Sequence, residues 1–167
     1  MLLNKTKLIP NQTIQITGSK SESNRLLILK QLFEGIEIKN ISNAQDTYLL
    51  QKALSEASEV VDIHHAGTAM RFLTSYFAIQ PEKEVVLTGS ERMKQRPIQP
   101  LVDALRALGA DIQYMENEGF PPLKIRGKEI EKNHVKISAH ISSQFITSLL
   151  LIGGKLKNGL EVELLGE

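Results

Sequence analysis

The chain has 167 residues, 41% hydrophobic and 23% charged, which suits one globular domain or a large part of one. Its 20 basic and 19 acidic side chains nearly balance without a basic block, so nothing favours a nucleic-acid partner. The absence of cysteine excludes disulfides, thiolate metal sites and a cysteine nucleophile in this chain. No apolar run approaches the roughly 20 residues of a membrane span, and residues 1–10 lack a signal-peptide core. We therefore expect a cytoplasmic protein.

Short alternating or β-branched runs recur along the chain, with helical patterns between them. The runs that predict strands are 13–16, 36–41, 60–63, 84–87, 112–114, 123–125, 135–137 and 160–164. The patterns that predict helices are 21–33, 46–57, 68–77, 97–108 and 143–152. We expect the first helix to bury Leu26, Leu29 and Phe33, which share one face at helical spacing.

The later helical patterns carry recognisable ends. Asp46 is a candidate N-cap for the second helix. Pro97 and Pro100 fall in the expected first turn of the fourth helix, and Gly109 ends it. The pattern at 143–152 is apolar almost all round, which is typical of a helix buried on every side.

The predicted elements repeat in the order strand, helix, strand, helix and two strands, with a period of roughly 50 to 75 residues. One unit covers about 13–63 and the next about 65–125, while a third begins near Val135 and has only its first helix and the following strand. The predicted fold class is therefore α/β, or α+β, with about two and a half repeated units. We expect the chain to be a fragment of a longer protein; a short natural protein with an edge strand at its end is the alternative.

Three polar segments combine a helix start with nearby cations, namely 18–25, 65–71 and 93–97. A fourth, at 142–145, has the polar helix start without a cation. A helix N-terminus offers free N–H donors and about half a positive charge. Several such ends favour a small ligand with more than one anionic group, such as a phosphorylated or carboxylated metabolite.

Each segment also has an ordinary structural interpretation. Lys20 can place a point charge on an anion, Ser21 and Ser23 offer hydroxyls, and Arg25 adds a bidentate fork. The same residues could form only a serine-capped helix with solvated cations. The segment also lacks the G-x-x-x-x-G-K-[ST] spacing of a P-loop, so a nucleoside triphosphatase is not predicted. Recurrence of the design at each helix start favours one shared anion site.

Eight motifs, in order, resemble those of the 5-enolpyruvylshikimate-3-phosphate synthase family. They are GSKSESNR at 18–25, NAQDT at 43–47, AGTAMR at 66–71, LTG at 87–89, RMKQRPI at 92–98, LVDAL at 101–105, LGA at 108–110 and SSQF at 142–145. The resemblance implies repeated βαβαββ units in two similar domains, with helix N-termini facing the cleft between them. It assigns residues 1–17 to a crossover strand region that belongs with an absent second domain. Residues 18–167 would form a substrate-binding domain that is incomplete at its C-terminal end.

The resemblance also implies a reaction, the transfer of the enolpyruvyl group from phosphoenolpyruvate to the 5-hydroxyl of shikimate 3-phosphate with release of phosphate. Two polyanions must then be held side by side, which requires many cations and N–H donors. No metal or organic cofactor is implied, and neither nucleic acid nor membrane is an expected partner. A full-length family member is expected to be a monomer, whereas a fragment could self-associate through uncovered surface.

Several residues match family positions for phosphoenolpyruvate. The resemblance implies that Lys20 contacts this ligand, lies close to both substrates and takes part in catalysis. Gly67 would supply backbone next to phosphoenolpyruvate, and Arg96 would pair with its anionic groups. Thr68 would lie beside the site. The same ligand position is where glyphosate binds in this family.

Other residues match positions for shikimate 3-phosphate. Ser21 and Arg25 would bind this ligand, and Ser142 and Ser143 would hold its phosphate. Gln144 would reach between the two ligands. No acidic residue of the chain fits the family's general acid or base, so we expect half a site and negligible turnover from the isolated chain.

Three further residues are possible members of the site: Asp46, His65 and Arg71. His65 stands where the family usually has Asn, and Phe72 where it usually has Pro, so sensitivity to glyphosate does not carry over. Adjacent histidines on a strand would face opposite ways, so His64 and His65 are not expected to bind a metal together.

Two alternatives to this function stay open at this point. A sister enolpyruvyl transferase acts on UDP-N-acetylglucosamine, but it carries Lys-Asn where this chain has Lys20-Ser21 and usually a cysteine that is absent here. A module that only captures phosphorylated metabolites would use the same helix ends. A solenoid repeat protein fits less well, because the recurring design lies at polar loops.

Overall fold

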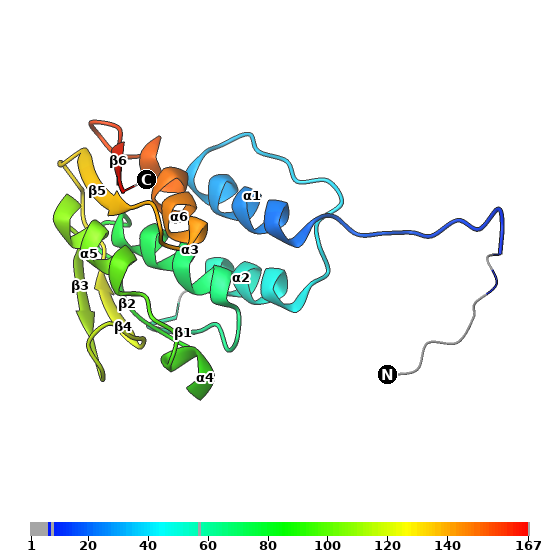
Figure 1. The fold of residues 1–167 in the computed structure, drawn as a ribbon, viewed down its shortest axis with the longest axis horizontal. Helices are drawn as coiled ribbons and strands as arrows, with labels where there is room; N and C mark the ends of the chain where they lie inside the picture. The colour runs from blue at the N-terminus through cyan, green and yellow to red at the C-terminus, as the bar shows by residue number, and fades with distance from the viewer. Residues whose placement is uncertain (1–6, 8, 57, 167) are drawn as a thin grey trace.

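The computed structural model describes residue 7, residues 9–56 and residues 58–166. Its helices are α1 (Lys20–Leu32), α2 (Gln45–Ser55), α3 (Gly67–Ala78), α4 (Glu91–Lys94), α5 (Gln99–Leu108) and α6 (Ser143–Gly153). Its strands are β1 (Val60–Asp62), β2 (Glu84–Thr88), β3 (Asp111–Tyr114), β4 (Leu123–Arg126), β5 (His134–Ser138) and β6 (Glu161–Leu165). Figure 1 shows their arrangement.

A four-stranded sheet in the order β1-β2-β4-β3 forms the centre of one complete βαβαββ unit. β1 and β2 are parallel and are joined through α3, whereas β4 runs antiparallel to both β2 and β3. The repeated order predicted from the sequence is confirmed here, but this unit begins at β1 rather than at residue 65. β5, α6 and β6 begin another unit in which the two strands pair in parallel.

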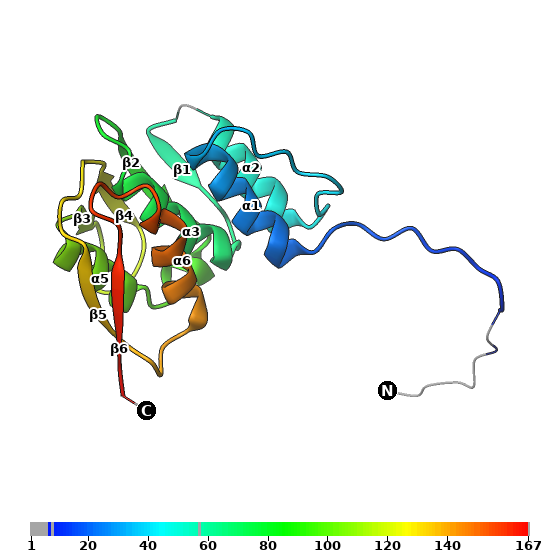
Figure 2. The same ribbon diagram turned by 90° about the horizontal axis from the view of Figure 1, so that it is seen from above.

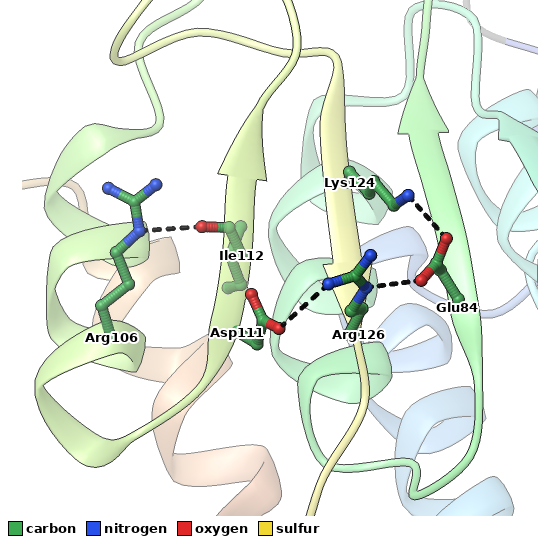
Figure 3. A network of polar contacts seen from close by, with 6 residues as sticks. All are labelled: Glu84, Arg106, Asp111, Ile112, Lys124 and Arg126. Atoms are coloured by element: carbon green, nitrogen blue, oxygen red, sulfur yellow. Dashed lines mark hydrogen bonds and ion pairs between the residues drawn. The ribbon is translucent and has the colours of Figure 1, made fainter.

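The central sheet buries one face and leaves the other to solvent, as strict alternation in its strands predicts. Its buried face consists of Val61, Val85, Leu87, Ile112, Leu123 and Ile125. α3 packs against β2 and β4, and α5 packs against β3. The outer face carries an ion-pair network, drawn in Figure 3. There Lys124 Nζ lies 2.7 Å from Glu84 Oε1, and Arg126 bonds the other oxygen of Glu84 and approaches Asp111.

α3 is the central buried helix of the molecule. Ten of its twelve residues are buried, and it contacts α1, α2, α5 and α6 as well as the sheet. The sequence instead predicted that the helix at 143–152 would be buried on every side, which is wrong. α6 buries Phe145, Leu149 and Ile152 against its neighbours, but Leu150 is 59% exposed. An apolar composition therefore did not distinguish a core helix from a surface helix.

α1 turns a different face inward from the one predicted. Leu27, Ile28 and Leu32 are buried, whereas the predicted Leu26, Leu29 and Phe33 are only partly buried. The inward face also carries two polar residues. Ser23 Oγ accepts a hydrogen bond from the backbone N–H of Ser42 at 2.9 Å, and Asn24 is fully buried. Because Ser23 and Asn24 are polar, the spacing of apolar residues alone did not indicate that this face of α1 is buried.

Two predicted strands are absent from the part of the chain that the structure describes. Residues 13–16 are irregular, and Ile14 and Ile16 are 81% and 75% exposed. In Figures 1 and 2 this segment extends away from the helices. Residues 36–41 are also irregular and join α1 to α2. Both segments have strand composition, but no described strand pairs with them, and a strand needs a partner to satisfy its backbone.

Helix ends agree with the sequence in part. Gly109 ends α5 in the left-handed conformation at φ 112°, as predicted. Pro100 lies in the first turn of α5, but Pro97 precedes its N-cap, Ile98. α2 ends at Ser55, and the predicted end at Ala57 lies outside the described residues. The four-residue helix α4 was not predicted, because one turn is too short to show a period. In the described part of the chain, no helix could cross a membrane.

Candidate functional site

The candidate site begins where the parallel strands β1 and β2 end. The loops that follow them are joined by backbone hydrogen bonds, from Ile63 N–H to Thr88 O at 3.1 Å and from Ser90 N–H to His64 O at 2.9 Å. Gly89 permits this approach, since a Cβ there would lie 2.5 Å from His64 O. The carboxyl ends of parallel strands and the following helix start are a common place for ligand binding. α3 begins at this edge.

Two arginine side chains converge on the N-terminus of α3. Gly67 is its first residue and is buried. A Cβ at Gly67 would overlap Arg96 Nη1 and lie 3.1 Å from Arg71 Nη1. Arg71 Nη1 also donates a hydrogen bond to Gly67 O at 2.7 Å. The absence of a Cβ at Gly67 therefore lets both guanidinium groups lie against this helix start in the positions seen here.

The charges at this point all have the same sign. Burial lowers the pKa of Arg71, and the nearby Arg96 guanidinium lowers it further. The N-terminus of α3 adds its partial positive charge. Among the described residues, no carboxylate lies within ion-pair distance of Arg71 or Arg96. A bound anion would relieve this repulsion, so the arrangement is suited to an anionic ligand.

Lys20 and Asp46 form a second part of the site. Lys20 is the first residue of α1, and its Nζ lies 3.6 Å from Asp46 Oδ2 at the start of α2. The predicted capping role of Asp46 is wrong, because Ala44 is the N-cap of α2 and Asp46 is its second residue. Asp46 instead anchors Lys20, whose side chain is 49% exposed and remains available to a ligand.

Arg25 connects α1 to α3. Its Nη1 donates to Ser21 O at 2.7 Å, so the side chain folds back along the helix toward its N-terminus. Its guanidinium carbon lies 5.9 Å from the centre of the Phe72 ring, one residue beyond Arg71 on α3. Ser21 is exposed in the first turn of α1. Ser21 and Arg25, the two residues of this segment predicted to bind shikimate 3-phosphate, therefore lie next to each other.

The start of α6 is joined to α3 through Arg71 and a pair of buried hydroxyls. The Arg71 guanidinium carbon lies 5.1 Å from the centre of the Phe145 ring. Ser148 Oγ donates to Arg71 O at 2.7 Å and lies 2.6 Å from Ser75 Oγ. At the helix start, Ser142 Oγ accepts from the Gln144 N–H at 3.4 Å. Ser142 and the neighbouring Ser143 are exposed and can meet a ligand.

The predicted site residues thus fall into three groups around the starts of α1, α3 and α6, with Asp46 of α2 joined to the first group through Lys20 and Arg96, which precedes α5, joined to the second. The members of these groups are Lys20, Ser21, Arg25 and Asp46; Gly67, Thr68, Arg71 and Arg96; and Ser142, Ser143 and Gln144. Arg25 connects the first group to α3 through Phe72, and Arg71 connects α3 to α6 through Phe145. Thr68 is half-buried in the first turn of α3.

A pocket of about 300 Å³ opens beside Arg96. It is lined by His65, Ser90, Arg92, Met93 and Arg96. A larger hollow of about 520 Å³ lies between α1 and α2, but none of the predicted site residues lines it. We place the candidate site at the smaller pocket and the α3 start, since the cations converge there. Sequence reasoning missed Ser90 and assigned no role to Arg92, although Arg92 lies in the motif at 92–98.

The two histidines are arranged differently from the prediction. They lie in the turn after β1, where His64 has a φ of 50°, and their Nδ1 atoms are 3.0 Å apart. The expectation that they would face opposite ways is wrong, because they are not in a strand. His65 borders the pocket. In the described residues, no group of three or more His, Cys, Asp or Glu side chains could hold a metal ion.

A family model described as EPSP synthase (3-phosphoshikimate 1-carboxyvinyltransferase) matches residues 50–166. The chain belongs to this family. A 3-phosphoshikimate 1-carboxyvinyltransferase of Bacteroides fragilis is 53% identical over 93% of this chain and 38% of its own length. The protein of that name from Haemophilus influenzae strain PittEE is 41% identical over 93% of this chain and 43% of its own length. The chain therefore spans about two fifths of the curated relatives that it matches.

Solved structures support the fold of this family member. The EPSP synthase of Acinetobacter baumannii superposes with a TM-score of 0.73, covering 84% of this chain and 37% of the neighbour. The sequence identity is 22%, so this likeness concerns the fold alone. The fold of this chain is thus the fold of a solved EPSP synthase over most of its length.

Proposed function

We propose that the EPSP synthase of which this chain forms part transfers the enolpyruvyl group of phosphoenolpyruvate to the 5-hydroxyl of shikimate 3-phosphate. The product then feeds aromatic amino-acid synthesis through chorismate, in the cytoplasm. The single observation that carries this proposal is the convergence of Arg71 and Arg96 on the buried Gly67, without a carboxylate partner among the described residues. The matched family makes this enolpyruvyl transfer the best-supported reaction.

The proposed chemistry has two steps. The 5-hydroxyl oxygen attacks C2 of phosphoenolpyruvate and loses its proton, while C3 accepts a proton, which gives a tetrahedral intermediate. The hydroxyl proton passes to a base in this first step. In the second step a base removes one proton from C3 as the C2–O bond to phosphate breaks, which leaves an enol ether and inorganic phosphate. Because both substrates are polyanions, their approach requires fixed positive charge. Holding them side by side also makes the encounter effectively intramolecular.

The α3 start and Arg96 would bind phosphoenolpyruvate. Arg96 is exposed and would form paired hydrogen bonds to its phosphate. The free N–H groups of the first turn at Gly67 and Thr68 would add neutral donors. Lys20, held by Asp46 at 3.6 Å, would place a mobile positive charge between the two ligands. Arg71 would act mainly by holding the α3 start in position.

The starts of α1 and α6 would bind shikimate 3-phosphate. Ser142 Oγ already accepts a hydrogen bond from Gln144 N–H, so its own proton is free to donate to a phosphate oxygen. Ser143 is exposed beside it. Arg25 and Ser21 would contact the ligand from α1. The proposed reaction uses no cofactor, and its general acid and base would come from the portion of the family sequence beyond this chain.

The experiment that tests this proposal is a chimera. Residues 1–167 would replace the matching N-terminal portion of the Bacteroides fragilis relative, and the parent relative would be the control. Phosphate release from phosphoenolpyruvate is measured with shikimate 3-phosphate or UDP-N-acetylglucosamine as acceptor. We expect release only with shikimate 3-phosphate. A folded chimera that works only with the sugar nucleotide, or with neither acceptor, contradicts the proposal.

A second candidate function is simple capture of phosphorylated metabolites by this chain alone. It is favoured by one observation, that the Gly67, Arg71 and Arg96 group is complete within a single chain. An isolated chain that binds phosphoenolpyruvate tightly, combined with an inactive chimera, would favour this capture function over enolpyruvyl transfer.

A further inference from the structure

We propose that His64 and His65 form a chelating site for a divalent transition-metal ion, with Cu²⁺ as the preferred ion. The two imidazole Nδ1 atoms would be its protein ligands, and water would complete the coordination. This site is separate from the proposed transfer reaction, which uses no cofactor. The inference therefore goes beyond the proposed function and does not depend on it.

The observation that carries the inference is the separation of the two ring nitrogens. His64 Nδ1 and His65 Nδ1 lie 3.0 Å apart. A transition metal binds imidazole nitrogen at about 2.0–2.1 Å, so two nitrogens at a right angle about the metal are about 2.8–3.0 Å apart. A tetrahedral angle would place them about 3.3–3.4 Å apart. The observed distance thus suits neighbouring positions of a tetragonal centre, which is typical of Cu²⁺ and Ni²⁺ with nitrogen ligands.

The same distance fits a hydrogen bond in which one ring N–H donates to the other ring nitrogen. A proton between the nitrogens occupies a lone pair that the metal needs, so the two states alternate. The metal binds when the donor ring carries its proton on Nε2 instead, and the neutral pair then loses no proton overall. Because the metal would lie off the line between the nitrogens, each ring would turn about its χ2 to face it.

The turn after β1 brings the two rings together. Ala66 N–H donates to Ile63 O at 3.0 Å and closes this turn. His64, at φ 50°, accepts the Ser90 N–H on its carbonyl at 2.9 Å, and its own N–H donates to Asp62 Oδ1 at 2.7 Å. Adjacent side chains of a strand would point in opposite directions. Because this backbone is fixed before binding, little conformational freedom is lost when a metal binds.

The pair is accessible to an ion from solvent. His64 and His65 are both exposed residues. Their rings meet edge to face, with centroids 5.0 Å apart and planes at 85°. A metal ion therefore has an entry path, and water can fill its remaining positions. Structural metal sites usually have four protein ligands, so a site with two predicts an exchangeable ion.

The surroundings of the pair determine which ions it accepts. In the described part of the chain, no third imidazole or carboxylate joins the pair as a metal-binding group. Arg92 and Arg96 line the pocket that His65 borders, so the local charge does not attract cations. Mg²⁺ and Ca²⁺ require oxygen ligands and are therefore excluded. Cu²⁺ gains most from bonds to imidazole nitrogen, ahead of Ni²⁺ and Zn²⁺.

The test uses the 167-residue chain in a non-coordinating buffer at about pH 7.5, where free imidazole is mostly neutral. The probes are Cu²⁺, Ni²⁺, Zn²⁺ and Mg²⁺ alone. Calorimetry gives the affinity, and electron paramagnetic resonance of the Cu²⁺ complex counts the bound nitrogens. The variants are His64→Asn and His65→Asn, since asparagine adopts positive φ readily and keeps the turn. His140→Asn, in the exposed turn after β5, is the matched loss of one imidazole.

We expect one Cu²⁺ per chain, bound through two imidazole nitrogens. His64→Asn and His65→Asn should each weaken Cu²⁺ binding at least about tenfold, because each removes the chelate and leaves a single imidazole. His140→Asn should leave the affinity within about twofold, since it lies outside the pair. Ni²⁺ and Zn²⁺ should bind more weakly than Cu²⁺, and Mg²⁺ should not bind.

The nitrogen count of the wild-type complex tests the inference without any variant. Coordination by one imidazole nitrogen, or no binding of Cu²⁺, overturns it. It is equally overturned if His140→Asn weakens binding as much as His64→Asn or His65→Asn does, because the ion would then bind at any exposed histidine. The activity of the chimera is measured without added metal, so the proposed function stands or fails separately.

Discussion

At the scale of single residues, the α3 start shows how one missing side chain creates a site. Gly67 has no Cβ, so the Arg71 and Arg96 guanidinium groups can both approach its backbone. Arg71 is the partly buried member and is held by Gly67 O, while Arg96 is exposed. The two like charges have different roles in consequence. We expect Arg71 to position the helix start and Arg96 to contact the ligand.

Gly67→Ala in the chimera should weaken phosphoenolpyruvate binding, because the added methyl would displace Arg96 from the α3 start. We expect the KM for phosphoenolpyruvate to rise about tenfold, because this is the effect of losing roughly one charge-assisted hydrogen bond. The KM for shikimate 3-phosphate should change much less.

The matched control is Gly154→Ala, at the end of α6, where φ is −71° and a Cβ would meet only the flexible Phe33 ring. If Gly67→Ala has the Tm of the wild type and unchanged KM values, the position of Arg96 does not depend on the absence of a side chain at residue 67.

At the scale of elements, buried hydroxyls fix α6 against α3. Ser148 donates its one hydroxyl proton to Arg71 O, so the bond to Ser75 must use the proton of Ser75. Both serines are fully buried. This arrangement sets how α6, which starts at Ser142 and Ser143, lies against the helix that carries Gly67. The hydroxyls thereby link the two proposed ligand sites.

Ser148→Ala should lower the free energy of unfolding by about 1–3 kcal/mol, because it leaves Ser75 Oγ and Arg71 O without their partner. Urea denaturation of the 167-residue chain measures this change. Ser143→Ala, exposed on the same helix, is the control and should have little effect. A double variant that also replaces Ser75 should recover part of the loss; a Ser148→Ala variant as stable as wild type would contradict this account.

The exposed face of the sheet gives a pH-dependent prediction. Hydrogen bonds from Lys124, and next from Arg126, lower the pKa of Glu84 below its ordinary value. The pKa of Glu84 is lower in the folded than in the unfolded chain. Its ion pairs therefore stabilise the fold fully above the unfolded pKa of about 4.3, and this stabilisation is lost as the pH falls through the folded pKa. Glu84→Gln should therefore be less stable than wild type at pH 7.

The difference in stability between wild type and Glu84→Gln should shrink as pH falls from 7 to about 3. Thermal unfolding at several pH values checks this, with Glu22→Gln, an exposed residue of α1, as the control. The effect should be modest and should weaken in salt, since Glu84 is half-exposed. A difference that grows on acidification would reverse the sign and contradict the network.

At the scale of the whole molecule, the sequence predicted the elements whose partners lie within the chain. β1 to β4, α3 and α5 were found because their periodic apolar residues meet one another in one core. Residues 13–16 and 36–41 have the same composition but no described partner, so composition alone mispredicted them. The inward face of α1 was missed because Ser23 and Asn24 are buried on it.

The candidate site was predictable wherever a motif named its residues. Gly67 and Arg96 were found in this way, but their contact joins residues almost 30 positions apart and needed the fold. Ser90 was overlooked because it lies in no quoted motif, and Arg92, although it lies in the motif at 92–98, was given no role because only the fold shows that it borders the pocket. The predicted role of Asp46 was wrong because a carboxylate at a helix start can either cap the helix or form an ion pair, and the sequence does not distinguish the two.

The central claim is that this chain provides two separate anion sites, one for each substrate. The most direct measurement is the pair of KM values in the chimera carrying Arg96→Gln or Arg25→Gln. We predict that Arg96→Gln raises the KM for phosphoenolpyruvate at least about tenfold while that for shikimate 3-phosphate changes little, and that Arg25→Gln does the reverse. Equal effects of both variants on both substrates, or no effect of either variant, would contradict the claim.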